Sequence, residues 1–118
     1  MIIIFMSEYL TEAIVLDKSP YGEFDFSVLL YTKILGKISA RAKSSRKITS
    51  RLNCHLEPLN HSLVRIVEKN GFQIADALSL GKYSNKLMTI TKLIDKISGV
   101  SNPDLKLWKI LRSMPYNK

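Results

Sequence analysis

The sequence predicts a mainly β protein, a five-stranded barrel followed by a short helical appendage. Apolar and polar residues alternate in short runs over the first two thirds of the chain, as they do in strands with one buried face. Turn-forming residues separate these runs. From Ser84 onward, apolar residues recur every three or four positions, which is the helical period. A chain of 118 residues fits one domain, and we divide it into a barrel over residues 1–81 and a two-helix segment over residues 82–118.

Five runs carry the strand pattern, and we place them at residues 9–17, 24–32, 37–43, 62–69 and 72–80. The third run alternates most regularly, with Ile38, Ala40 and Ala42 on one face and charged or polar residues on the other. A turn is expected at residues 19–22, which read Ser-Pro-Tyr-Gly. The pair Asn70-Gly71 suits a hairpin turn between the last two strands, because both central residues of a type I′ turn need positive φ.

Two helices are expected after the strands. Ser84 is a plausible N-cap of the first helix, and Gly99 follows its apolar stripe where a C-cap glycine belongs. Asn102 and Pro103 are typical of the cap and first position of the second helix, which Pro115 ends. Five short strands in this arrangement are typical of an OB-type barrel, a fold that often binds single-stranded nucleic acid or oligosaccharide.

Basic residues are concentrated in one part of the chain. The net charge is +8 and the isoelectric point is about 9.7, which favours acidic partners. Residues 33–51 contain seven Lys or Arg and no Asp or Glu, whereas residues 1–32 have a net charge of −4. Such a concentration is more informative than the total charge, and it indicates nucleic-acid binding.

The candidate binding residues come from the third strand and from residues 44–52, which we expect to form a mobile loop. Lys and Arg residues on one face of a β-strand and on a loop can follow a phosphate backbone without reading the nucleic-acid sequence. Tyr31, predicted on the surface of the second strand, is the candidate for stacking on bases. The predicted DNA-binding residues are Lys37, Arg41, Lys43, Arg46, Lys47, Arg51 and Tyr31. An alternative is that the bases only protect an edge strand from pairing with other chains.

Other chemistries find little support in the sequence. Cys54, His55 and His61 lie close together, but their spacing does not match a zinc site. The acidic residues are scattered, and the five glycines form no phosphate loop. We therefore predict a non-catalytic protein without metal or cofactor. A single cysteine excludes an intramolecular disulfide, which suits a reducing cytoplasm, and no apolar run is long enough to cross a membrane. Met1 or Met6 is the expected start.

A series of short motifs in this order resembles the N-terminal domain of the RecO family of bacterial recombination mediators. The motifs are TEAIVL at residues 11–16, YGEFD at 21–25, YT at 31–32, GKI at 36–38, AK at 42–43, RK at 46–47, SRL at 50–52 and LEP at 56–58. The resemblance covers about residues 9–80. It implies an OB fold that binds single- and double-stranded DNA with little sequence preference, promotes strand annealing and acts in recombinational repair at the nucleoid. It also implies RecR, RecA and the single-strand-binding protein as partners.

The resemblance places the family's basic motif on the same six bases that charge alone selects. Members of the family are about twice as long, with a larger helical domain and often a four-cysteine zinc site. One cysteine cannot form that site, and we expect a reduced relative or a truncated gene product. Two other functions stay open: a protein-interaction module that uses the apolar helical stripe, and RNA binding, since OB folds bind both nucleic acids.

Overall fold

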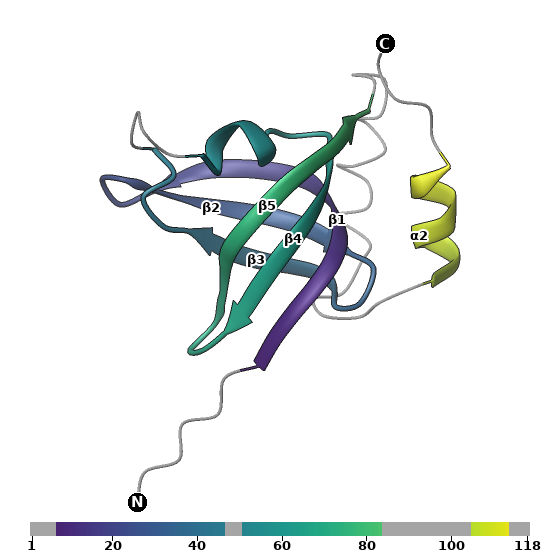
Figure 1. The fold of residues 1–118 in the computed structure, drawn as a ribbon, viewed down its shortest axis with the longest axis horizontal. Coiled ribbons are helices and arrows are strands. Elements are labelled where there is room, and N and C mark those ends of the chain that lie inside the picture. The colour runs from purple at the N-terminus through teal and green to yellow at the C-terminus, as the bar shows by residue number, and fades with distance from the viewer. Residues whose placement is uncertain (1–6, 47–50, 84–104, 114–118) are drawn as a thin grey trace, which may run out of the picture.

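A computed structural model describes residues 7–46, 51–83 and 105–113 (Figure 1). The predicted mainly β fold with five strands and a C-terminal helix is confirmed. The strands are β1 (Ser7–Tyr21), β2 (Asp25–Thr32), β3 (Gly36–Ala42), β4 (Asn60–Glu68) and β5 (Phe72–Lys82). A short 3₁₀ helix η1 (Asn53–His55) precedes β4, and the helix α2 (Leu105–Arg112) follows the barrel. The helix expected at residues 84–99 lies outside the described residues, as do Asn102, Pro103 and Pro115.

The five strands close into a barrel in the order β1-β2-β3-β5-β4. All neighbouring strands are antiparallel except β3 and β5, which run parallel. Only two residue pairs form this parallel seam, Ala40 with Phe72 and Arg41 with Gln73. The seam is therefore the least paired junction of the barrel.

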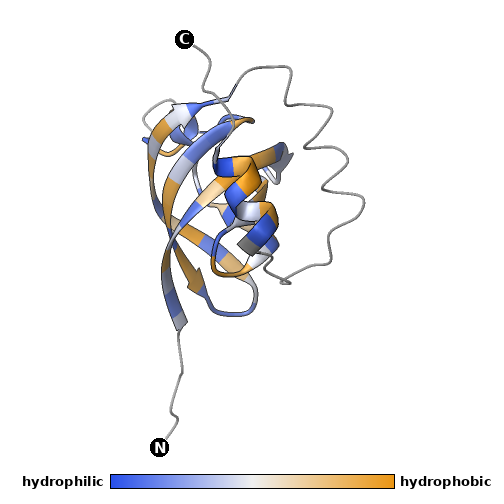
Figure 2. Cartoon of the chain, turned by 90° about the vertical axis from the view of Figure 1, so that its right-hand side faces the viewer, coloured by the Kyte–Doolittle hydropathy of each residue, from blue (hydrophilic) through white to orange (hydrophobic). Residues whose placement is uncertain are grey.

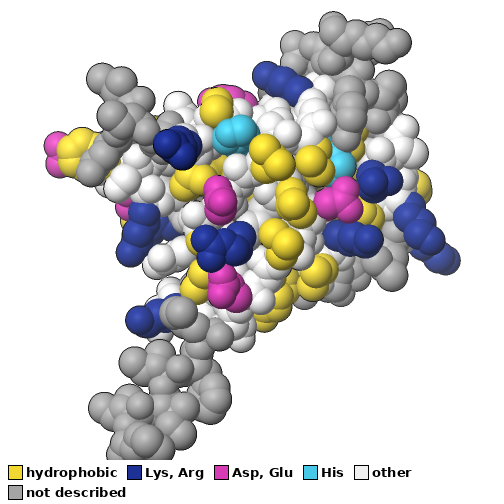
Figure 3. Space-filling view, in the orientation of Figure 1, with side chains coloured by type: hydrophobic (Ala, Val, Ile, Leu, Met, Phe, Trp, Pro, Cys, Tyr) yellow, Lys and Arg dark blue, Asp and Glu magenta, His cyan; other side chains and the backbone are white. Residues whose placement is uncertain are grey.

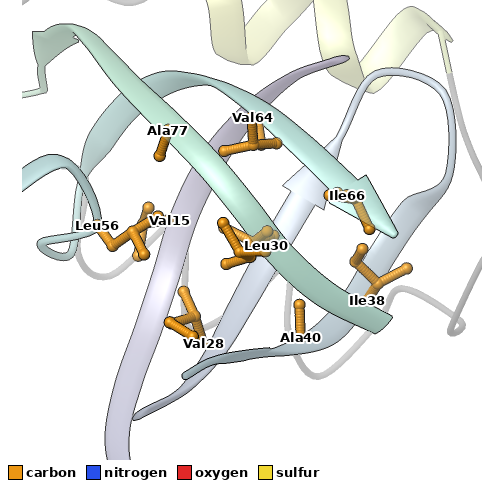
Figure 4. Packing of buried hydrophobic residues seen from close by; sticks show 12 residues of the cluster. Val15, Val28, Leu30, Ile38, Ala40, Leu56, Val64, Ile66 and Ala77 are labelled. Carbon is orange, nitrogen blue, oxygen red and sulfur yellow. The ribbon is translucent and has the colours of Figure 1, made fainter. Parts of the chain in front are cut away.

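Alternating residues of every strand fill the barrel interior (Figure 4). Val28 and Leu30 of β2 meet Ile38 and Ala40 of β3 there, and Leu56, which follows η1, is part of the same cluster. The predicted inward faces of the second and third strands are thus confirmed. Because the inward positions of β3 are apolar, its intervening residues lie on the outer face.

A second hydrophobic cluster lies between the outer face of the barrel and α2. Figure 2 shows this helix in front of the strands. Trp108 and Leu111 of α2 are buried in this cluster, together with Ile14 and Leu16 of β1. Residues 13–16 are an unbroken apolar run because both faces of β1 are covered at this point, one by the barrel core and one by α2.

The first turn differs from the prediction, whereas the last turn agrees with it. Residues 19–21 continue β1, and the β1–β2 turn comes later, at residues 22–24, where Gly22 has φ of 65°. Pro20 is tolerated because residues 18–21 pair only with β2, so that this part of β1 is an edge. In the β4–β5 turn, Asn70 and Gly71 have the expected positive φ, 51° and 104°.

Candidate nucleic-acid interface

Three of the basic residues predicted to bind DNA lie close together at the end of β3. Arg41 lies on the outer face of β3, and Lys43 and Arg46 belong to residues 43–46, which we call the basic turn. The backbone N–H of Arg46 donates to Phe24 O at 2.8 Å, and its guanidinium Nη1 donates to Gly22 O at 2.9 Å. These two hydrogen bonds hold the basic turn against the β1–β2 turn.

The expectation of a mobile loop over residues 44–52 is wrong for its first part. The backbone N–H of Ser44 donates to the Asp25 carboxylate at 2.7 Å. The Ser45 side chain is buried, and its hydroxyl donates to Ala42 O at 2.8 Å. The Ser45 hydroxyl therefore closes the turn locally, as short polar side chains often do.

The other predicted residues do not join this cluster. Lys37 lies on the predicted face of β3 but is only 9% exposed. Its cross-strand neighbour Tyr31 is 1% exposed and stacks on Trp108, with ring centroids 6.5 Å apart. The prediction that Tyr31 is exposed for stacking on bases is therefore wrong, because α2 covers this part of the sheet. Arg51 is exposed before η1, and Lys47 lies outside the described residues.

Acidic residues approach the basic cluster in space although none interrupts it in sequence. The β1–β2 turn carries Glu23, and Asp25 begins β2 beside the basic turn. Their negative charges offset part of the positive charge of Arg41, Lys43 and Arg46. The local excess of positive charge is therefore smaller than the sequence run predicts.

A hollow of about 220 Å³ lies beside this cluster, on the outer side of the β3–β5 seam. We call it the seam hollow. It is lined by Tyr21, Ser27, Ser39, Ala40, Arg41, Asn70, Gly71, Phe72 and Gln73. Amide, hydroxyl and guanidinium groups converge here, and these groups donate and accept hydrogen bonds with base edges and phosphates.

Arg41 and Tyr21 form one wall of the seam hollow. The Arg41 Cζ lies 4.3 Å from the centroid of the Tyr21 ring, which is cation–π geometry. Tyr21 is 49% exposed, so part of its surface is open to solvent beside the hollow. A guanidinium that stacks on an aromatic ring keeps its planar set of N–H donors at the rim, where they suit a phosphate.

Lys18 lies near this surface, but its side chain makes contacts inside the protein. Its buried Nζ donates to the Asn53 Oδ1 at 2.5 Å and to the Glu57 carboxylate at 2.9 Å, and it lies 4.3 Å from the Phe26 ring centroid. These contacts join β1 to η1 and to the residues after it. Lys18 is therefore engaged inside the protein.

Tyr21, Asn70 and Gln73 line the seam hollow, but the sequence does not select them as binding residues. Tyr21 is predicted to lie in the turn at residues 19–22. Asn70 is predicted to form the turn between the last two strands, where only its backbone conformation matters. A signal was present, because OB-type barrels bind ligands on the face of strands two and three and on the loops between strands one and two and strands four and five. Applied to the predicted fold, this rule selects the β4–β5 turn and the end of β1.

A second charged group links α2 to the barrel. Glu12 of β1 accepts hydrogen bonds on one oxygen from His61 Nε2 at 3.0 Å and from Arg112 Nε at 3.1 Å. Burial acts to raise the pKa of Glu12, but the hydrogen bonds and charge of Arg112, together with His61, outweigh it and lower that pKa. Burial also lowers the pKa of His61, against the opposing effect of Glu12. Figure 3 shows Lys and Arg side chains gathered on this side of the molecule.

Two further observations concern metals and membranes. No group of three or more His, Cys, Asp or Glu side chains among the described residues is arranged to hold a metal ion. His55 Nδ1 instead accepts the Ser79 N–H at 3.0 Å. Within the same residues, no helix has the length and apolar character needed to cross a bilayer.

The strand order and the parallel β3–β5 seam define the class of the protein as a small OB-type barrel. Its sequence is similar to a defined family. The family model described as "Recombination protein O N terminal" matches residues 6–82. The chain belongs to this RecO family, a family of DNA repair proteins, as the resemblance predicts.

Similar proteins from several bacteria carry the name DNA repair protein RecO. The one from Thermodesulfovibrio yellowstonii is 49% identical over 61 residues, which is 52% of this chain and 24% of that protein. The one from Nocardioides sp. is 39% identical over 80 residues, or 67% and 33% of the two chains. The one from Bifidobacterium longum is 31% identical over 111 residues, or 85% and 46%. The chain thus spans between a quarter and a half of these curated relatives.

Proposed function

We propose that the barrel binds DNA without catalysis, holding a single strand across the outer face of β2 and β3. The observation that carries this proposal is the Arg41–Tyr21 wall of the seam hollow. Arg41 supplies a charged donor for a phosphate, and Tyr21 supplies an exposed aromatic surface for a base. The polar side chains of Asn70 and Gln73 lie on the opposite side of the same hollow.

The expected binding has little sequence preference. Arg41, Lys43 and Arg46 suit phosphates, which carry no sequence information. Lys47 and Arg51 stay predictions as additional contacts. Double-stranded DNA offers the same phosphates, so that binding of duplexes and annealing of complementary strands belong to the same proposal.

A salt titration with a fluorescent twelve-nucleotide DNA strand tests the proposal. Three phosphate contacts predict a slope of about −2 for log K against log salt, and five predict about −3.5. Arg41→Gln should weaken binding about fivefold at 0.1 M salt, because one contact is lost. Lys82→Gln is the matched control, since it removes one exposed charge at the far end of β5. A slope near zero, or equal effects of both variants, would contradict the proposal.

RNA is the alternative ligand, because basic and aromatic side chains that contact the phosphate backbone and stack on nucleobases do not distinguish RNA from DNA. Membership in a family of DNA repair proteins favours DNA. Competition between DNA and RNA strands of the same sequence decides the preference. Tighter binding of RNA would replace DNA as the proposed ligand.

A protein-binding role is a second candidate, supported by an apolar patch on the outer face of β1, β4 and β5. Leu10 is 63% exposed and Leu78 is 55% exposed, and with Leu63 they border a hollow of about 230 Å³. Figure 3 shows hydrophobic side chains gathered over this face. Exposed apolar patches of this kind often mark interaction surfaces. By family resemblance, the partners to test are RecR, RecA and the single-strand-binding protein.

Pull-down with these three purified proteins tests the second candidate. Leu78→Lys should abolish capture by any partner that uses the patch, without changing DNA binding. Capture that is equal for wild type and variant would remove the patch from consideration.

A further inference from the structure

A third hollow, of about 320 Å³, lies where α2 meets the barrel, at the opposite end of β3 from the basic turn. We call it the helix hollow. It is lined by Glu12, Lys33, Trp108, Lys109 and Arg112. None of these residues belongs to the predicted binding set. Three of the five carry positive charge, and they come from two separate parts of the chain.

Backbone and core contacts place the cations around the helix hollow. The N–H of Lys33 donates to Glu12 O at 3.0 Å, which fixes the start of the β2–β3 turn beside β1. Trp108 is buried against the barrel and thereby sets the rotation of α2. Lys109 and Arg112 are three positions apart, so that they lie on neighbouring positions of one helix face.

The charges of the helix hollow leave a net positive excess. Its one carboxylate, Glu12, already accepts hydrogen bonds from Arg112 and His61. Among the described residues, Lys33 and Lys109 form no ion pair. The hollow therefore combines three cations with one anion, and all three cations are exposed to solvent. Trp108 adds a buried indole N–H that has no hydrogen-bond acceptor in the described part of the chain.

We propose that the helix hollow binds a phosphate group of the same DNA strand that crosses the seam hollow. This inference rests on the proposed function and extends the interface onto α2. From Gly36, beside the helix hollow, to Arg41 is five residues of β3, or about 17 Å at about 3.3 Å per residue. One strand of a DNA duplex advances about 3.4 Å per nucleotide along the helix axis, so this distance corresponds to at most about five nucleotide steps. A strand of twelve nucleotides is long enough to reach both hollows.

The position of α2 relative to β3 favours a DNA strand over an isolated anion as the ligand. An isolated anion would need only the helix hollow, but this hollow and Arg41 lie toward opposite ends of β3, and the basic turn follows Arg41. Positively charged side chains at both ends of β3 favour a ligand with regularly repeated negative charges. DNA has this property, with one phosphate for each nucleotide.

Charge-removing variants of the exposed lysines test the inference. The double variant Lys33→Gln/Lys109→Gln should weaken binding of a twelve-nucleotide DNA strand about fivefold for each lost contact at 0.1 M salt. The slope of log K against log salt should become less negative by about 1.4. Lys82→Gln measures the effect of losing one positive charge outside the helix hollow, and circular dichroism confirms that each variant is folded. Unchanged affinity and slope in the double variant, with weakened binding in Arg41→Gln, would overturn the inference and leave the proposed function intact.

A second measurement is independent of DNA. Trp108 is the only tryptophan of the chain, so its fluorescence reports on the helix hollow. Titration with inorganic phosphate, at constant ionic strength set with potassium chloride, should change this fluorescence in wild type but not in the double variant. No change in wild type, or an equal change in both proteins, would overturn the inference. A specific change in a protein that does not bind DNA would keep the phosphate site and remove the proposed function.

Discussion

Glu12 and Arg112 lie 100 positions apart in the sequence, yet the Arg112 Nε donates to the Glu12 carboxylate at 3.1 Å. The same carboxylate oxygen accepts a hydrogen bond from the buried His61. One side chain of β1 thus joins β4 and α2. Because a carboxylate only accepts hydrogen bonds, a neutral His61 donates from Nε2.

Replacing Glu12 should therefore cost more stability than replacing another acid of the same strand. Glu12→Ala leaves the His61 donor buried without an acceptor and should lower the free energy of unfolding by about 1–3 kcal/mol. Glu8→Ala is the matched control, since the Glu8–Arg65 pair is half exposed and should contribute less than about 1 kcal/mol. Urea denaturation measures both values. Equal losses would show that the link through Glu12 adds no stability.

Acid should destabilise the protein in two steps. The pKa of His61 is lowered by burial, so the unfolded chain binds this proton first, and stability falls as pH drops below about 6.5. The pKa of Glu12 is also lowered, and its contribution is lost at more acidic pH, below about 4.5. His61→Gln should flatten the decline between pH 7.5 and 5.5. An unchanged decline in this variant would assign the acid sensitivity to other groups.

The second hydrophobic cluster should depend on Trp108. Trp108→Ala removes the largest buried side chain between α2 and the barrel and should cost about 3–5 kcal/mol. Ile110→Ala, on the exposed side of the same helix, should change stability by less than about 0.5 kcal/mol. Thermal unfolding followed by circular dichroism compares them. Similar melting temperatures for the two variants would contradict the packing of α2 on the barrel.

Two tyrosines should have opposite roles. Tyr21→Leu should weaken DNA binding about fivefold or more, through the loss of about 1 kcal/mol of stacking, and leave stability nearly unchanged. Tyr31→Leu should lower stability, because the ring is buried against Trp108, and leave the affinity of the folded protein unchanged. Anisotropy titrations and urea denaturation on both variants separate these effects. The reverse pattern would restore Tyr31 as the stacking residue.

The β1–β2 turn should tolerate only residues that adopt positive φ. A Cβ at Gly22 would meet no atom within 4 Å, so that the cost of substitution comes from the backbone alone. Gly22→Val should cost about 1–2 kcal/mol, and Gly22→Asn should cost less, because asparagine visits this region more readily. Urea denaturation of both variants provides the comparison. Equal costs would mean that the turn changes its conformation.

The sequence carries enough information for the barrel and less for its surface. Alternation in β3 correctly predicts which residues face the core, because a strand has only two faces. The burial of Tyr31 depends on α2, more than 70 positions away, and no local pattern reports such a contact. The unbroken apolar run at residues 13–16 was the available signal that the outer face of β1 is covered. Lys43 and Arg46 are both exposed, but the sequence predicts one in a strand and the other in a mobile loop, and the nearby Glu23 and Asp25 come from another part of the chain.

The short seam between β3 and β5 has a consequence for the dynamics of the barrel. Only two residue pairs close it, so that transient separation of these strands is expected to be among the most frequent openings and to expose the surrounding amides to hydrogen exchange. The seam hollow has Ser39 and Arg41 on one side and Gln73 on the other. A strand of DNA seated there would bridge the two sides and slow the exchange of both β3 and β5. Bound DNA would thus link β3 and β5 at the junction where the two strands share few backbone pairs.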